Sequence, residues 1–269
     1  MPAWVDQVLH DPALQPFAPK RRWSGAQREE HVLFLHYRVA IDELRALVPP
    51  QLELQQYDGS AWVATIALQM NDVCLRSLPL PGEFGRFSEI DFAALVQYEG
   101  RLGFYFLSIE GAHWFSSLVT RWATRLPYLS SNAHVRLEDG RFRATSGPRW
   151  VRGRAAASFD AVYSPSRSNV IPDLGSPVHM LVGQYSAFVV RRGEVYEMDE
   201  IHAPWQLDEA DTEIRENTIP DAAGVTVART PDLQHYALRR DIVSWLPLRV
   251  RPGRPGLAPA EPPDVESSP

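Results

Sequence analysis

Two acidic residues lie two positions apart in the segment FSEIDFAALV, residues 87–96. The neighbours of Glu89 and Asp91 favour an extended strand, which would point both side chains to the same face. Two carboxyl groups held together in a half-enclosed pocket separate their pKa values, and one can then serve as a general acid. A solvated strand start, or an ion pair with Arg76, Arg149 or Arg152, would explain the pattern without catalysis. Each of these arginines could also bind a ligand carboxylate through two hydrogen bonds.

A histidine stands in a second segment of interest, IHAPWQL, residues 201–207. Pro204 restricts the residue before it to an extended conformation, which makes the segment rigid. His202 is therefore a candidate acid, base or hydrogen-bond donor in a pocket. Trp205 fits the core better than a surface on which a ligand stacks.

The common catalytic signatures are absent from the chain. We find no G-x-S-x-G, no phosphate-binding loop, no H-E-x-x-H and no G-x-G-x-x-G. Cys74 has no base nearby in NDVCLRS and fits a small buried apolar residue better than a nucleophile. The eight histidines are scattered, so only a site assembled from distant histidines could hold a metal. We expect no metal and no cofactor.

The composition is that of a globular protein of moderate acidity. Of 269 residues 45% are hydrophobic, and the net charge is −6, which argues against nucleic-acid binding because such proteins carry a basic surface. Among the 27 basic residues only Lys20 is lysine, which removes lysine from most catalytic schemes. A single cysteine excludes an intramolecular disulfide and fits a cytoplasmic protein. We expect no signal peptide and no membrane span, because no apolar run is long enough.

The residue patterns predict many short strands and two main helices. Helical spacing of apolar residues marks 41–48, which Pro49 and Pro50 end, and about 112–126, where we expect Trp114, Leu118 and Trp122 to pack in the core. Segment 164–177 is expected to be a loop, and the acidic segment 208–217 to be solvated. Strands are expected at 31–39, 61–70, 91–98, 102–109, the Asp-Gly hairpin 134–145, 155–163, 183–190, 194–202, 226–230 and, as the last strand, within 235–250.

The elements suggest one domain between two terminal segments. We expect an N-terminal arm over residues 1–30, a single domain over 31–250, and a disordered tail over 251–269. The tail holds too many prolines and too few apolar residues to offset its ordering entropy. Repeated hairpins with few helices predict an α+β fold, mostly antiparallel β, as a barrel or curved sheet. The second helix would lie at the barrel's open end or along its wall.

Six segments in this order resemble a known family. HVLFLHYRVAIDELRALVPPQLELQQYDGSAWVATIALQM, EIDFAALV with GFYFLSIEG, RLPYLS, GQYSAF, IHAPWQL and ENTIPDAAGV with HYALRRDIVSW resemble the YqjF-like family of bacterial proteins of unassigned function. The resemblance extends over about residues 28–250 and places the chain in the acetoacetate decarboxylase-like superfamily. It implies a cone-shaped antiparallel β barrel with an internal pocket and a few packed helices.

The resemblance also implies a role for Tyr128. In acetoacetate decarboxylases a helix leads into Gly-Phe-Pro-Lys, and the lysine forms a Schiff base with a keto acid. Here Leu126-Pro127-Tyr128 stands in that place, and a phenol cannot form an iminium. Lys20 lies in the N-terminal arm. We therefore expect no Schiff-base decarboxylation, and Tyr128 either donates a hydrogen bond to a ligand or fills the pocket.

The chain departs from its nearer relatives at two arginines. The family pattern at 89–96 is close to Glu-x-Asn-x-Arg-Thr-Tyr-Val, and here Ala93 replaces the arginine. Near 181–185 the family tends to have Glu-Arg-Tyr, where this chain keeps Tyr185 but has Gln184. Two groups that could hold an anion are thus missing, which suggests a more apolar or altered ligand.

Two functions remain open at this point. The first is a barrel that binds a small, partly apolar carbonyl or carboxylate compound. The second is a lyase or hydrolase in which a Glu or Asp works with a Tyr or His as acid and base. A homo-oligomer is a further possibility. The pocket candidates are Tyr128, Glu89, Asp91, Arg149, Tyr185 and His202.

Overall fold

Antiparallel strands dominate the computed structural model, which describes residues 2–76, 78–80, 82–112, 114–150, 156–170, 172–173 and 176–250. The predicted disordered tail and Arg152 lie outside these residues. The helices are α1 Ala3–His10, α2 Ile41–Arg45, α3 Trp114–Thr124, α4 Pro177–Val182 and α5 Ile219–Ala223, with 3-10 turns η1 Gln15–Phe17 and η2 Gly82–Phe84.

The strands form a single sheet. Their bounds are β1 Gly25–Val39, β2 Glu53–Leu54, β3 Gln56–Tyr57, β4 Ser60–Leu75, β5 Leu78–Pro79, β6 Phe87–Tyr98, β7 Arg101–Gly111, β8 Tyr128–Ser130, β9 His134–Glu138, β10 Arg141–Arg149, β11 Ala157–Val170, β12 Ser186–Arg191, β13 Glu194–Ile201, β14 Leu207–Asn217, β15 Leu233–Ser244 and β16 Leu248–Arg249.

Part of this sheet closes on itself. The strand order is β13-β12-β7-β6-β4-β1-β15, and β15 pairs again with β13. The β12–β13 hairpin joins β7 through one pair, Ala187 with Phe104, at a point where β7 carries Gly103. A Cβ on Gly103 would lie 2.4 Å from the carbonyl oxygen of Ser186, so only glycine allows β12 to approach so closely. The ring thus encloses an interior.

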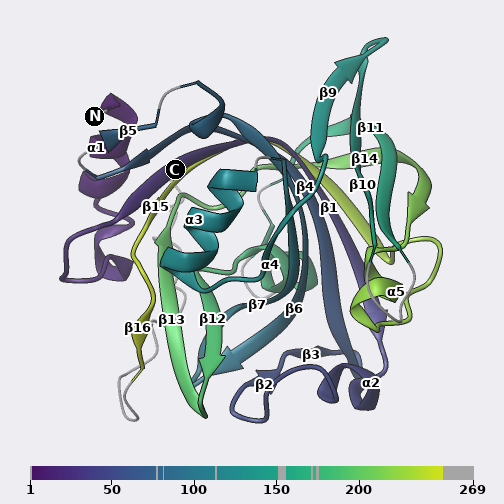
Figure 1. The fold of residues 1–269 in the computed structure, drawn as a ribbon, viewed down its shortest axis with the longest axis horizontal. Helices are drawn as coiled ribbons and strands as arrows, with labels where there is room; N and C mark the ends of the chain where they lie inside the picture. The colour runs from purple at the N-terminus through teal and green to yellow at the C-terminus, as the bar shows by residue number, and fades with distance from the viewer. Residues whose placement is uncertain are drawn as a thin grey trace, which may run out of the picture.

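The two faces of the long strands serve different purposes. Residues of β1, β4 and β6 such as Leu35, Val63 and Phe92 point outward and pack on β11 and its neighbours, which stand at the right in Figure 1. Their alternates, such as Phe34 and Ile66, point into the ring. This alternation follows from the two-residue period of a strand. The main core therefore lies outside the ring, and the ring's interior is free to hold a cavity.

Several sequence predictions need correction. The acidic segment 208–217 has the solvated side chains that we expected, and Asp211 meets Arg141 at 3.3 Å, but its backbone is a strand that was not predicted, because β14 pairs along β11. The prediction of a strand at 226–230 is wrong. Segment 164–177 is partly strand, since β11 extends to Val170. The first strand begins at Gly25, so the predicted arm contributes to the sheet.

The apolar stripe of α3 is also not where the sequence placed it. Leu118 is 56% exposed and Trp122 is 85% exposed, whereas Leu126, after the helix, is buried. The helix lies in front of the ring in Figure 1, so one side of it meets the interior and the other meets solvent. Arg121 on the same helix is exposed as well. Helical periodicity predicted an amphipathic helix but assigned two large residues to the wrong face.

No helix among the described residues has both the length and the apolar character needed to cross a membrane. The N-terminal segment packs on the domain instead. Helix α1 buries Trp4 and Val5 in a small cluster with Trp245, the residue that follows β15.

Candidate functional site

A cavity of about 620 Å³ lies inside the ring and is covered by α3. Its size falls within the range of roughly 300–1,000 Å³ that small-molecule sites occupy. Most of its wall is apolar, with a few converging polar groups. The apolar side chains deepest in the fold come from β1, β4, β6, β7 and the segments before β12 and after β13: Phe34, Ile66, Leu68, Met70, Phe87, Phe104, Phe106, Ile109, Val182 and Trp205.

Glu89 and Asp91 both line this cavity from β6. They are two residues apart on the strand, so their side chains share a face. Glu89 is 1% exposed and Asp91 is 6% exposed. One carboxyl oxygen of each, Glu89 Oε1 and Asp91 Oδ1, has no hydrogen-bond partner among the described residues. A buried oxygen without a partner costs free energy, and a ligand in the cavity could remove that cost.

Tyr128 reaches the same cavity from β8. Its hydroxyl group lies beside the carboxyl group of Glu89, and burial followed by the charge of Glu89 raises the pKa of Tyr128. The tight turn at Pro127 sets its position, because the N–H of Tyr128 bonds to the carbonyl oxygen of Leu126 at 2.8 Å. The chain then pairs with β7, which places Tyr128 opposite Ile109. The proline thus ends the helical segment and starts the strand that carries the phenol inward.

Strand register explains why these groups meet. A row of directly paired residues crosses five strands from β8 to β1, and every member lines the cavity. Residues in one row point to one face of a sheet. The row consists of Tyr128, Ile109, Asp91, Ile66 and Phe34.

Two further acids line the cavity that the sequence did not single out, Glu29 on β1 and Glu200 on β13. Glu200 alternates with buried residues on β13 and faces inward together with Met198. That alternation was visible in EVYEMDEIH, but only the closure of the ring turns this face toward Glu89. Glu29 was assigned to the N-terminal arm, because the first strand was predicted to begin at residue 31 and in fact begins at Gly25.

Burial sets the protonation of these acids. It raises the pKa of Glu89 to about 8, with a further rise from the charge of Glu29. Burial likewise raises the pKa of Glu200 to about 8 and that of Glu29 to about 7. The pKa of Asp91 lies well above its usual value, because of burial and the neighbouring Glu89. At neutral pH most of this cluster is therefore protonated, and a protonated carboxyl group is a hydrogen-bond donor.

His202 also lines the cavity, but in a different electrostatic state. Burial, followed by the charge of Arg240, lowers its pKa to about 4, so its ring is neutral at physiological pH. Its Nδ1 contacts the carbonyl oxygen of Ala203 at 2.8 Å. The ring of Tyr185 stacks on it with centroids 4.6 Å apart. These contacts fix the ring, which suits positioning better than proton transfer.

Arg149 and Tyr185 are not among the residues that line the cavity. The guanidinium of Arg149 is bound to the buried carboxylate of Glu110, with Nε–Oε2 at 2.8 Å. It is therefore held by a structural ion pair and is not available to bind a ligand. Tyr185 lies behind His202. Ala93 and Gln184, the positions of the missing arginines, are both buried, and Gln184 lines the cavity.

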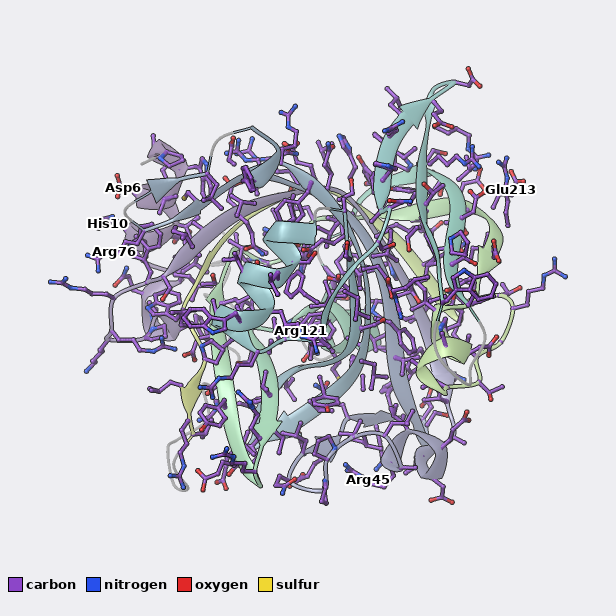
Figure 2. The ribbon with its side chains drawn as sticks, in the orientation of Figure 1. Asp6, His10, Arg45, Arg76, Arg121 and Glu213 are labelled. Carbon is purple, nitrogen blue, oxygen red and sulfur yellow. The ribbon has the colours of Figure 1, made fainter. Side chains whose placement is uncertain are left out.

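Arg76 is the one arginine on the described cavity wall, and it lies at an exposed edge. Its side chain is at the left margin of the molecule in Figure 2, whereas Arg121 lies near the centre on α3. Within the described residues no group of three or more His, Cys, Asp or Glu is arranged to hold a metal ion. The site therefore offers acids and a phenol, with a cation only at its edge.

Comparison with known proteins agrees with this architecture. Residues 26–241 match a family described as uncharacterized conserved protein, DUF2071. The chain is 32% identical over 231 residues to the uncharacterized protein YqjF of Bacillus subtilis strain 168, covering 86% of this chain and 94% of that protein.

Solved structures show the same fold at low sequence identity. An acetoacetate decarboxylase has a TM-score of 0.59 and 14% identity, covering 93% of this chain and 98% of its own. The enduracididine biosynthesis enzyme MppR, in complex with pyruvate, has a TM-score of 0.57 and 14% identity, covering 86% and 92%. The fold is thus that of acetoacetate decarboxylase-like proteins, mostly antiparallel β with few helices, as the sequence predicted.

Proposed function

The chain belongs to the DUF2071 family of uncharacterized conserved proteins, and we propose that in this member the cavity binds a small, partly apolar carbonyl compound without forming a Schiff base with it. The observation that carries this proposal is the placement of the Tyr128 hydroxyl group and the Glu89 carboxyl group side by side on the wall of one cavity. With Asp91 beside them, these groups offer several O–H donors to one acceptor oxygen.

Charge favours a neutral carbonyl over a carboxylate. Four acids line the described wall, and the one arginine there, Arg76, is at the edge. A ligand carboxylate beside Glu89 and Asp91 would be a buried charge without a cation next to it, and any acid of the cluster that ionises would repel it, which is costly. A ketone or aldehyde oxygen accepts hydrogen bonds from protonated Glu89 and from Tyr128 without adding charge. The apolar part of the ligand then packs against the apolar side chains of the cavity.

The absence of a Schiff base rests on the position of the single lysine. Lys20 is the only lysine in the sequence and is not among the residues that line the cavity. Tyr128 occupies the wall where the chain leaves α3, and its hydroxyl group cannot condense with a carbonyl. Binding at this site therefore does not proceed through an imine.

A thermal-shift titration tests this proposal. Short ketones, aldehydes and the matching carboxylic acids are added to the full chain, since a ligand that binds only the folded state raises the melting temperature. We expect ketones and aldehydes to raise it more than the matching carboxylates do. Tyr128→Phe should reduce the shift, because it removes one donor and changes little in shape. Equal shifts for carboxylates and ketones, or shifts that Tyr128→Phe leaves unchanged, would contradict the proposal.

The same pair of groups favours a second candidate function, acid–base catalysis as in a lyase or hydrolase. General acids and bases work best when their pKa lies near the working pH, and the pKa of Glu89 is about 8. Protonated Glu89 or Tyr128 would polarise the carbonyl while an ionised carboxylate of the cluster takes a proton from the adjacent carbon. His202 fits this role less well, because its pKa is about 4 and its ring is held by backbone contacts.

Exchange of the ketone's α-protons with deuterated water distinguishes simple binding from acid–base catalysis. Butanone is incubated with the protein in deuterated water, and loss of the α-proton signals is followed by NMR. An acid–base enzyme should accelerate this loss well above the buffer rate, and Asp91→Asn or Glu89→Gln should abolish the acceleration. Binding without any acceleration would leave the carbonyl-binding function and exclude enolisation of this class of ketone.

A further inference from the structure

Exposed apolar side chains line part of the cavity, and we infer that its ligand is an elongated molecule with a carbonyl group at one end and an alkyl chain that runs to the protein surface. This inference rests on the proposed function and specifies its ligand class. It comes from four exposed apolar side chains that line the same cavity as the acids, Leu75, Phe84, Val119 and Leu246. We call these four residues the mouth.

The mouth brings together residues from separate segments. Leu75 ends β4, Phe84 belongs to η2, Val119 lies on α3 and Leu246 follows β15. Their exposed fractions are 49%, 37%, 43% and 46%. Scattered exposed apolar residues need no explanation, but exposed apolar residues that line one cavity mark a binding surface. Four of the ten large exposed apolar side chains in the described residues border this one cavity.

The wall that β4 contributes is apolar from the mouth inward, because Leu75, Cys74, Met70, Leu68 and Ile66 all line the cavity. Cys74, Ile242 and Trp245 lie on the wall near the mouth, and Met70 and Phe87 lie farther in. Glu89 pairs with Leu68 and Asp91 with Ile66, so both acids lie beyond Met70 along this wall, and Glu29 lies opposite Met70. A chain of methylene groups can thus follow β4 from Glu89 to the mouth.

Helix α3 forms one side of this passage. Val119, Thr120, Ala123 and Thr124 line the cavity along the helix, while Trp122 points to solvent. The lining side chains are short, which leaves width for a chain of methylene groups. A ketone of only three or four carbons would occupy the acid end and leave the mouth in contact with water. A longer chain would cover it and gain the free energy of apolar burial.

A series of straight-chain methyl ketones, from butanone to undecanone, tests the inference. Dissociation constants are measured by calorimetry with the full-length protein at a pH below the pKa of Glu89. We expect each added methylene to tighten binding about four-fold until the chain reaches the mouth, after which the gain should stop. Leu246→Asp should weaken binding of the longest ketones by about ten-fold or more and leave butanone unaffected.

The matched control is Leu137→Asp. Leu137 is 65% exposed and lies on β9, outside the cavity lining, so this change should affect no ketone. An affinity that does not depend on chain length, or a chain-length dependence that Leu246→Asp leaves intact, would overturn the inference.

The same series distinguishes a failure of this inference from a failure of the proposed carbonyl-binding function. If butanone binds and Tyr128→Phe weakens its binding, but longer ketones bind no more tightly, the carbonyl site is supported and the passage for the alkyl chain is contradicted. If longer chains bind more tightly but Tyr128→Phe has no effect at any length, the carbonyl site fails. If no ketone binds, both fail.

Discussion

Glu89 and Asp91 lie two residues apart on β6, and each keeps one carboxyl oxygen without a hydrogen-bond partner on the wall of one cavity. Neither is in an ion pair with an arginine among the described residues, and neither is exposed to bulk water. A structural role would normally satisfy such oxygens. Their state, protonated and donating or ionised and accepting, therefore governs what the cavity can bind.

Ketone binding should depend on pH through Glu89. Its pKa is about 8, so the donor form dominates below that value and is lost above it. We expect affinity for butanone to be nearly constant at lower pH and to fall by up to about ten-fold per pH unit above about 8. Glu89→Gln keeps a donor at all pH values and should flatten this profile. The measurement is a calorimetric titration at several pH values, and an unchanged profile in Glu89→Gln would assign the dependence to another group.

Stability should decrease as pH rises. The acids of the cavity hold protons in the folded state up to a pKa of about 7 to 8 but lose them near 4.5 when unfolded. Between these values the folded state binds more protons, so the free energy of unfolding falls as pH increases. Each such group contributes a slope of about 1.4 kcal/mol per pH unit within its window. Chemical denaturation from pH 5 to 9 measures the slope, and Glu89→Gln should reduce it.

The single lysine predicts the outcome of reductive trapping. Borohydride added with acetoacetate or pyruvate should leave the mass of the native chain unchanged. Tyr128→Lys would place an amine beside Glu89 in the cavity, and we expect this variant to acquire a reducible adduct that peptide mapping locates at position 128. Lys20→Arg serves as the control and should change neither result. An adduct on Lys20 in the native protein would contradict the assignment of Tyr128 as the group nearest the carbonyl.

Gly111 should be required for the position of α3. A Cβ at this residue would lie 2.5 Å from Oγ of Ser117 on the helix, so Gly111→Ala should push the helix outward and cost about 1–3 kcal/mol of stability. Ser117→Ala removes the opposing atom. The double variant should therefore recover most of the loss, while Ser117→Ala alone should be close to neutral. Thermal denaturation of the four proteins completes the cycle, and failure of the rescue would place the strain elsewhere.

The fold was largely predictable because its signals are local. The Asp-Gly turn at 139–140, the alternation in β4 and the Pro127 boundary each follow from short stretches of sequence. The acidic β14 was missed because its pairing with β11 outweighs its composition, and tertiary pairing is invisible in a single segment. The exposure of Trp122 was missed because a helix pattern does not say which side faces the domain.

The candidate site was predictable only in part. Glu89 and Asp91 were found because they share one strand, and Tyr128 because of a family resemblance. Glu29 and Glu200 were not found, since they approach Glu89 only when β1 and β13 are brought together across the ring. Arg149 was a candidate because an arginine can bind a carboxylate. Its buried partner Glu110 lies 39 positions away, so no local sequence pattern predicts that ion pair.

The attachment of the β12–β13 hairpin has a consequence for motion. Three register pairs hold it in the ring, Ala187 with Phe104 on one side and Glu200 with Ser244 and Ile201 with Val243 on the other. The other ring joints, such as β1–β4 and β6–β7, have many more. Opening free energies follow the number of contacts that must break, so we expect this hairpin to open more readily than the other strands of the ring. Its backbone amides should exchange with solvent first, and because it carries Glu200, their exchange should become faster as that acid loses its proton.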